Sequence, residues 1–410
     1  PFENNSIEGS NSVLERDWNR YLEDVARANK LICNIDLVTD NSLTTAERAQ
    51  YKAEAKIFRA MVMFDMVRLW GDFPVITTVA DDITSENIDE VYPQYFPKQN
   101  TELEAYQQIE KDLLDAVLYA PDNTPGNKTL FSKSVARTLL AKIYAEKPLR
   151  DYTKVIQYCD EVKADGFDLV DDFSDLFGMN AAGTDAKMRN TKESILEAQF
   201  TSGAGNWCTW MFGRDLVNWN NNFTWAKWVT PSRDLISAFK QEGDEVRFKE
   251  SIVYYDCNWS NYYPSDNYPF MYKCRSANSS IIKYRYADVL LLKAEALIMQ
   301  DTPDLEGAAD IIDEVRDRAK LGALPTSVRS NKNVLLNALL KERRLELAFE
   351  GQRWFDLVRL DKVEEVMNAV YSKDSGRKAQ IYTFDKNSYR LPIPQSVIDA
   401  NDKIHQNPGY

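Results

Sequence analysis

Helical periodicity dominates the pattern of hydrophobic and polar positions along most of the chain. Residues 44–70 begin at Thr44, a residue type that caps helix N-termini, and Glu47 follows three positions later. In the second half of this segment, apolar residues cover most of a helical circumference, so we expect a buried helix. Gly71 suits the left-handed conformation that ends a helix, and Pro74 prevents the helix from resuming.

Further helices are predicted in pairs that are joined by short loops. One pair falls at about 132–146 and 151–163, and a second at about 286–300 and 304–320. Amphipathic helix pairs of this size are typical of tetratricopeptide-like repeats, which stack because no single pair can bury its apolar face. Additional helices are expected at about 101–119, 333–350 and 353–370.

The sequence Phe-Asp-x-Val-Arg-Leu occurs twice in the chain. Asp65 and Arg68 belong to the first copy, and Asp356 and Arg359 belong to the second. In each copy the two charges lie three positions apart, on one face of a helix, where they can pair. We interpret both as structural ion pairs that lock helix packing.

The pattern changes between the two sets of helix pairs. Helical periodicity fades, Asn, Gly and Ser become frequent, and short β-type segments occur at 194–200 and 250–255. Long insertions between repeats tend to carry function.

These patterns predict a mostly α-helical fold: a tetratricopeptide-like scaffold with a long, irregular, aromatic-rich insertion that contains few short strands. We expect residues 1–410 to form a single domain. Its helical-repeat parts occupy 18–165 and 283–370, its irregular ligand-bearing part occupies 190–282, and its closing segment occupies 380–410.

Charge and composition exclude several functions. The net charge of −13 argues against a nucleic-acid partner, because such a surface would repel phosphates. The single histidine, His405, leaves no Ser–His–Asp, Cys–His or histidine-rich metal site. No glycine-rich phosphate loop is present, so we expect no cofactor. No carboxylate pair stands out among the 63 acidic residues, so we expect a binding protein and not an enzyme.

Aromatic residues concentrate in the irregular part, where six of the nine tryptophans lie between positions 207 and 259, interleaved with asparagines. Sugars have C–H faces that stack on aromatic rings and hydroxyl groups that bond to amides. The alternative interpretation is that these rings form a satellite hydrophobic core, and for any single ring the two remain open. The candidate carbohydrate-binding residues are Trp207, Trp210, Trp219, Asn220, Trp225, Trp259, Tyr262 and Tyr263.

Five segments, in order along the chain, resemble signatures of the SusD/RagB family of outer-membrane nutrient-binding proteins. The resemblance implies a helical fold with four tetratricopeptide-like pairs and a less regular ligand-bearing part. The matching motifs are elements of helix packing and turns, so they indicate the scaffold and not the ligand. The segments are 53–77, 229–252, 283–297, 341–360 and 389–410.

The same resemblance implies a function in polysaccharide utilisation and nutrient uptake. Such a protein is a surface-exposed lipoprotein of the outer membrane. It captures oligosaccharides for a SusC-like TonB-dependent transporter, and it contacts the membrane only through an N-terminal lipid anchor that this sequence does not contain. The alternatives are a peptide-binding relative on the same scaffold, a repeat adaptor for protein partners and, last, a glycan-cleaving enzyme.

Overall fold

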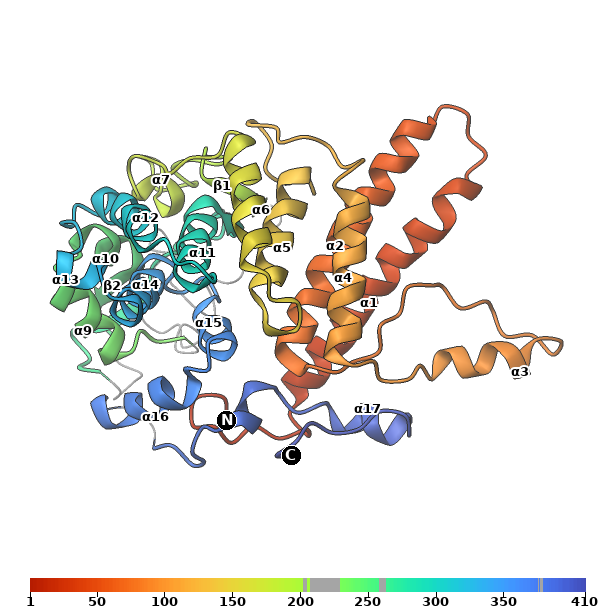
Figure 1. Cartoon of the computed structure of the whole chain (residues 1–410). Helices are drawn as coiled ribbons and strands as arrows, with labels where there is room; N and C mark the ends of the chain where they lie inside the picture. Colours follow the sequence, from red (N-terminus) through yellow and green to blue (C-terminus); the bar gives the residue numbers. More distant parts are fainter. Residues whose placement is uncertain (202–204, 207–228, 258–262, 375, 377–378) are drawn as a thin grey trace.

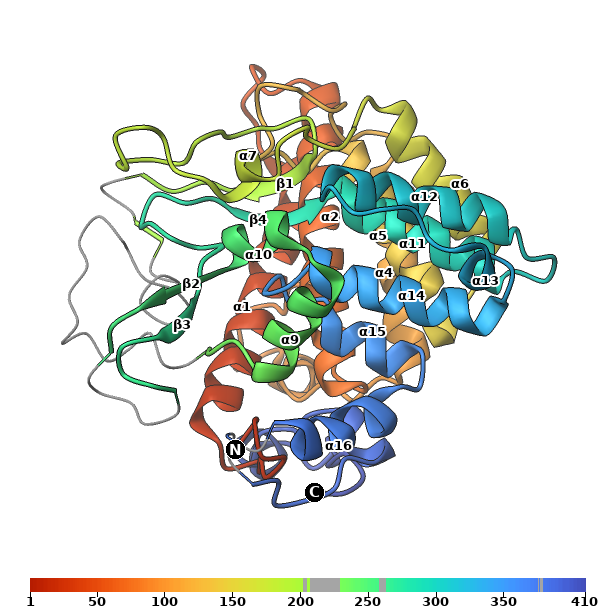
Figure 2. The same ribbon diagram turned by 90° about the vertical axis from the view of Figure 1, so that its left-hand side faces the viewer.

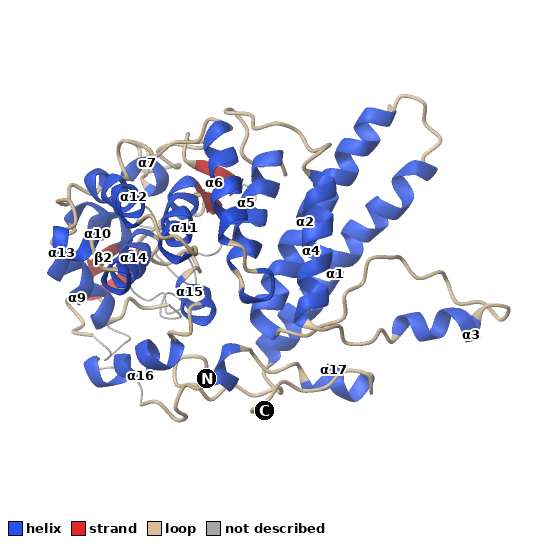
Figure 3. Ribbon diagram, in the orientation of Figure 1, coloured by secondary structure: helices blue, strands red, loops and turns tan. Residues whose placement is uncertain are grey.

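Helices form most of the structure, in agreement with the predicted fold class (Figure 3). Every strand in the described part of the chain lies between residues 194 and 285, so the strands fall in the region predicted to be irregular except for the last three residues of the final strand. No helix in that part is both long and apolar enough to cross a bilayer. The computed structural model describes residues 1–201, 205–206, 229–257, 263–374, 376 and 379–410.

Two long helices, α1 (Ser12–Asn34) and α2 (Thr45–Trp70), run side by side and extend past the end of α4 (Glu102–Ala116) (Figure 1). Thr44 and Glu47 form a reciprocal capping box at the start of α2, as their spacing predicts. Gly71 ends the helix with a φ of 73°, a value that side-chain-bearing residues rarely adopt.

The scaffold helices pack in succession: α2 on α4, α4 on α5, α5 on α6, α6 on α11, and α11 on both α12 and α14. Helices α6 and α11 are therefore neighbours although the irregular region separates them in sequence (Figure 1). The two predicted helix pairs correspond to α5 with α6 and to α11 with α12. The bounds are α5 (Lys133–Ala145), α6 (Tyr152–Ala164), α11 (Tyr286–Met299), α12 (Leu305–Arg318) and α14 (Lys332–Glu346).

The irregular region contributes two small antiparallel sheets. Strand β1 (Ser194–Ala198) pairs with β4 (Ile281–Arg285), which leads directly into α11. Strand β2 (Ile252–Tyr255) pairs with β3 (Tyr268–Met271) and extends from the side that carries α9 and α10 (Figure 2). These two helices span Arg233–Glu242 and Glu245–Ser251.

The prediction of a single helix at 353–370 is wrong. The segment forms α15 (Arg353–Arg359) and α16 (Val363–Lys373), separated by a turn. Asp361 in this turn adopts a φ of 55°, which an α-helix does not accommodate, and two lysines from distant segments pair with its carboxylate. The remaining short helices among the described residues are α3 (Ile88–Val91), α7 (Ser174–Phe177), α13 (Thr326–Arg329) and α17 (Gln395–Ala400), with 3₁₀ turns at Ile35–Leu37, Tyr92–Tyr95, Lys147–Leu149 and Lys386–Tyr389.

The C-terminal segment returns to the start of the chain. The amide of Gln395 donates to the carbonyl of Gly9 over 3.0 Å. Farther along, the side chain of Asn407 donates to the carbonyl of Trp70, the last residue of α2, over 2.8 Å. Both ends of the chain are thereby attached to the long helices of the scaffold.

One buried carboxylate connects four parts of the chain. Glu346, at the end of α14, is fully buried and pairs with Arg247 at 3.0 Å, Arg285 at 2.5 Å and Arg318. These arginines come from α10, the end of β4 and the end of α12. Burial alone would raise the pKa of Glu346, but the three guanidinium groups outweigh it and hold the pKa well below its usual value.

A second buried cluster contains the predicted ion pair of α15. Asp356 lies 2.7 Å from Arg359 and 2.8 Å from Arg343, and Arg343 also pairs with Asp288 of α11. Because these groups lie on α15, α14 and α11, the structural interpretation of Asp356 and Arg359 is confirmed.

Replacing Glu346 with Gln should strongly destabilise the protein. The change leaves three buried guanidinium groups without their common counter-charge, a loss that typically costs about 3–5 kcal/mol. Urea unfolding at neutral pH measures the change in the free energy of unfolding. A Glu365→Gln control removes an exposed partner of Lys362 and should change stability by less than about 0.5 kcal/mol. Equal effects of the two substitutions would contradict the account.

Candidate functional site

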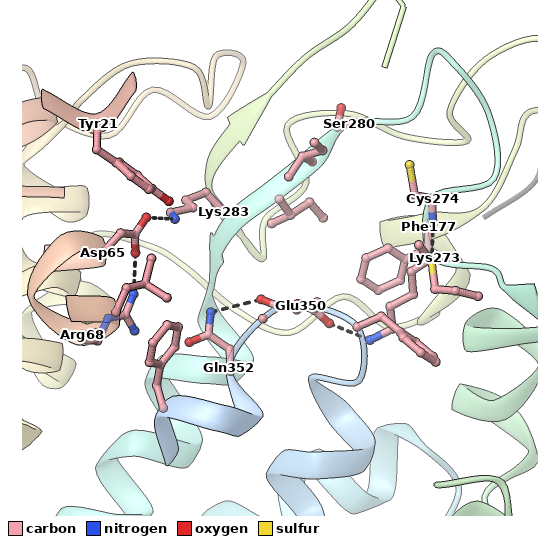
Figure 4. Close-up of a pocket in the computed structure, with 17 residues that line it drawn as sticks. Tyr21, Asp65, Arg68, Phe177, Lys273, Cys274, Ser280, Lys283, Glu350 and Gln352 are labelled. Atoms are coloured by element: carbon pink, nitrogen blue, oxygen red, sulfur yellow. Dashed lines mark hydrogen bonds and ion pairs between the residues drawn. The ribbon is translucent and has the colours of Figure 1, made fainter. Parts of the chain in front are cut away.

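A cavity of about 420 Å³ opens where α2, β4 and the turn between α14 and α15 meet (Figure 4). Its volume lies in the range of small-molecule sites. Its walls are largely apolar, and its polar groups gather at two ends. The polar and charged lining residues are Tyr21, Asp65, Arg68, Lys273, Ser280, Lys283, Glu350 and Gln352.

At one end of the cavity, a carboxylate is held by two cations. Asp65 of α2 lies 2.5 Å from Arg68 and 2.6 Å from Lys283 of β4. Burial would raise the pKa of Asp65, but Lys283 and Arg68 together lower it. The carboxylate is therefore ionised at neutral pH, and its ion pairs join α2 to β4.

The guanidinium group of Arg68 lies between two aromatic rings. Its centre is 3.9 Å from the ring centroid of Phe64 and 4.0 Å from that of Phe355. Cations over aromatic faces are attracted by the ring quadrupole. Phe355 belongs to the second copy of the repeated motif, so the two copies contact each other directly. The structural interpretation of Asp65 and Arg68 is confirmed, but both residues also line the cavity.

At the other end, Glu350 pairs with Lys273 at 2.6 Å and with Arg285 at 2.7 Å. The ammonium group of Lys273 also donates to the backbone carbonyl of Glu346 over 2.9 Å. Burial lowers the pKa of Lys273 to about 8, although the charge of Glu350 opposes this shift. Through Lys273 and Arg285, this end of the cavity is attached to the buried Glu346 cluster.

The turn between α14 and α15 positions Glu350 by means of an unusual backbone. Phe349 has a φ of 65° and Gly351 a φ of 75°. A bulky residue at positive φ is strained, and such strain persists only where the surrounding structure imposes it. The neighbouring residue Glu350 is held by its ion pairs with Lys273 and Arg285, which fix the carboxylate at the edge of the cavity.

Seven of the eight predicted carbohydrate-binding residues (Trp207, Trp210, Trp219, Asn220, Trp225, Trp259 and Tyr262) lie outside the described residues. The eighth, Tyr263, does not line the cavity. Its hydroxyl donates to the carbonyl of Pro231 over 2.8 Å, and its ring lies edge-on to Tyr268 and 4.1 Å from the guanidinium group of Arg233. The aromatic platform stays a prediction.

Asn206, which precedes Trp207 in the sequence, bonds to a loop that leads into the cavity lining. The amide of Asn206 donates to the carbonyl of Ala277 over 2.5 Å, and its side chain donates to the carbonyl of Ser279 over 3.1 Å. Ser280, the next residue after this loop, lines the cavity.

Sequence reasoning did not assign the cavity. Asp65 and Lys283 come from segments 218 positions apart, so no local pattern places them together. The available signal was the repeated motif, whose second copy supplies Phe355 to the same wall.

Two parts of the chain match family models. Residues 266–410 match the model described as "SusD family", and residues 2–145 match one described as "Starch-binding associating with outer membrane". Together the two matches account for both ends of the scaffold.

Relatives align over nearly the whole length. A SusD-like protein of Formosa agariphila is 28% identical, over 98% of this chain and 81% of that protein. The starch-binding protein SusD of Bacteroides thetaiotaomicron is 24% identical, over 92% of this chain and 76% of that protein.

Solved structures share the fold. A SusD homologue from Bacteroides thetaiotaomicron superposes with a TM-score of 0.79 at 23% identity, over 99% of this chain and 88% of the other. A laminarin-binding SusD-like protein gives a TM-score of 0.72 at 24% identity, over 96% and 85%.

Replacing Lys273 with Met should change how stability depends on pH. The folded pKa of about 8 lies below the usual 10.5. Between these values the unfolded chain holds a proton that the folded protein has released, so the free energy of unfolding of the wild type rises with pH in that window. From pH 7 to pH 10 the wild type should gain on the order of 1–3 kcal/mol relative to the variant, measured by urea unfolding.

The matched control is Lys30→Met, at an exposed lysine of α1. Its stability should follow the wild type at each pH. Parallel pH profiles for the wild type and the Lys273→Met variant would contradict the assignment of a lowered pKa to Lys273.

Proposed function

This chain belongs to the SusD family, and on that premise we propose that it captures oligosaccharides at the bacterial outer membrane and passes them to a SusC-like TonB-dependent transporter. The observation that carries the proposal is the cavity of about 420 Å³ with an apolar wall and charged ends, on a scaffold shared with SusD-like proteins. The protein would be a surface-exposed lipoprotein of the outer membrane.

The relatives support a glycan as the ligand class. One is named a starch-binding protein and a structural neighbour is named a laminarin-binding protein, and both names refer to glucans. The description of the N-terminal family model supports association with the outer membrane.

The tryptophan-rich segment would add a stacking surface to the cavity. Aromatic rings and amides together satisfy the C–H faces and the hydroxyl groups of a sugar. The contacts of Asn206 with Ala277 and Ser279 support this proposal, because Asn206 directly precedes Trp207 in the sequence and bonds to the residue before Ser280 of the cavity lining.

The cavity carboxylates favour binding without cleavage. Glycoside hydrolysis needs a carboxyl group whose pKa is raised so that it can act as an acid. Asp65 and Glu350 each pair with two cations, and in both cases the cations lower the pKa despite burial. Neither is suited to donate a proton at neutral pH.

The purified protein should therefore release no reducing ends from oligosaccharides or polysaccharides. A colorimetric reducing-sugar assay over several hours measures this directly. Release of sugar that is abolished by Glu350→Gln or Asp65→Asn would establish an enzyme and overturn the binding assignment.

Blocking the cavity should abolish glycan capture. Ile281 lines the cavity and is 36% exposed, so Ile281→Trp fills space at the opening at little cost to the core. In calorimetric titrations with a panel of oligosaccharides, the variant should bind at least tenfold more weakly than the wild type, a change of about 1.4 kcal/mol.

The control is Leu118→Trp, at a residue 66% exposed and outside the cavity lining. It should bind like the wild type, and both variants should melt within about 3 °C of it, as expected of surface changes. Unchanged binding by Ile281→Trp would remove the cavity from the ligand site, and failure of every glycan to bind the wild type would refute the function.

A further inference from the structure

We propose that the cavity binds the carboxylate of an acidic sugar, so that the captured oligosaccharide carries a uronic acid residue. The inference rests on the proposed function and narrows its substrate class. It follows from an imbalance between the donors and the acceptors that the cavity lining leaves available to a ligand.

The acceptors of the cavity carboxylates are already engaged. One oxygen of Asp65 accepts from Arg68 and the other from Lys283. One oxygen of Glu350 accepts from Lys273 and from Arg285, and the other accepts from Arg285 as well. A ligand that offers only hydrogen-bond donors would have to compete with these internal ion pairs.

The donors are engaged only in part. An ammonium group has three N–H donors, and within the described part of the chain Lys283 uses one of them, on Asp65. The side chain of Lys283 is 37% exposed. Arg68 donates from Nε to the carbonyl of Phe64 and from Nη2 to Asp65, and its Nη1 forms no hydrogen bond with a residue in the described part of the chain.

The geometry of Arg68 makes its unused donor specific. The side chain is almost fully buried, and the rings of Phe64 and Phe355 fix the plane of the guanidinium group. A guanidinium group whose plane is fixed loses little entropy when it binds a planar carboxylate, and charge-assisted bonds of this kind are the strong ones. Nη1 of Arg68 and Nζ of Lys283 are the donors that such a carboxylate would use, because both residues line the same end of the cavity and both pair with Asp65 (Figure 4).

The charges of the lining residues also favour a ligand carboxylate at short range. Three cations, Arg68, Lys273 and Lys283, line the cavity with two carboxylates, Asp65 and Glu350, so the lining carries one excess positive charge. Arg285, which does not line the cavity, also pairs with Glu350 and so neutralises part of its negative charge. A ligand carboxylate would restore neutrality in a largely apolar surrounding, where charge pairs are stronger than in water.

The apolar lining residues and the net charge of the whole chain favour an acidic sugar that carries few charges. The aromatic ring of Phe355 and the aliphatic side chain of Ile282 supply apolar surface for sugar C–H groups, and Tyr21 and Ser280 supply hydroxyl groups. The whole chain carries a net charge of −13, which repels a polyanion at distances beyond a few ångströms. An isolated uronate within an otherwise neutral oligosaccharide satisfies both conditions.

Matched pairs of ligands test the proposal. Each oligosaccharide that carries glucuronate or galacturonate is compared, by calorimetric titration, with its own carboxyl-reduced neutral form, so that linkage and length stay constant. The wild type should bind the acidic member of at least one pair tenfold or more tightly than the reduced member. Lys283→Met should bring the two affinities within about threefold, because it removes the exposed cation from the cavity.

Lys293→Met is the matched control. Lys293 pairs with Asp160 at 2.5 Å, as Lys283 pairs with Asp65, but it lies outside the cavity. Its preference for the acidic member should equal that of the wild type. Equal loss of the preference in both lysine variants would overturn the assignment to this cavity.

The remaining outcomes separate this inference from the proposed function. If the reduced members bind as tightly as the acidic ones, the uronate proposal is wrong and glycan capture stands. If no glycan binds, both are wrong. Binding of a short peptide that is lost when its C-terminal carboxylate is amidated, with no binding of acidic glycans, would overturn both in favour of a peptide carboxylate.

Discussion

The shared ion pairs of Glu346 are the interaction on which the other features of the structure depend. A single buried carboxylate pairs with Arg247, Arg285 and Arg318, which come from parts of the chain that are distant in sequence. A cluster of this kind adds little net stability compared with an apolar core, because burying each charge is costly. Its effect is geometric, since Glu346 must lie within ion-pair distance of arginines from three other elements, and this requirement restricts how α10, β4, α12 and α14 can pack together.

The residues at one end of the cavity are held in place by this cluster. Arg285 bonds to both Glu346 and Glu350, and Lys273 bonds to Glu350 and to the carbonyl of Glu346. On the opposite side, Lys283 extends from the same strand as Arg285 to pair with Asp65 of α2. The strand β4 thus carries cations to both ends of the cavity, and the strained turn at Phe349 is held against it. A ligand that bound a cavity fixed in this way would spend little binding energy on ordering it.

The parts of the fold that could be predicted from the sequence are those set by local chemistry. The capping box of Thr44, the positive φ of Gly71 and the helix pairs all follow from residues near one another in the chain. The break at Asp361 could not be predicted, because its stabilising partners, Lys147 and Lys386, lie far away in sequence.

The cavity escaped prediction for the same reason. Its ion pairs join residues that no periodicity relates, and the repeated motif indicated only that Asp65 and Arg68 can pair with each other. Composition directed attention to the tryptophans instead, because aromatic clustering is visible along a sequence and the assembly of Asp65, Lys283 and Glu350 is not. Of the aromatic candidates in the described part of the chain, Tyr263 serves to pack the hairpin of β2 and β3 against the start of α9.

A crystal structure of the protein with a bound oligosaccharide tests the central claim most directly. The account predicts sugar density inside the cavity, with a ligand oxygen at hydrogen-bond distance, about 2.7–3.2 Å, from Nζ of Lys283. The backbone of α2, β4 and the turn before α15 should lie within about 1 Å of its position in the free protein, because the Glu346 cluster already holds it there. Ordered sugar at another surface while the cavity stays unoccupied, or a complex in which the ion pairs of Glu346 have separated, would contradict it.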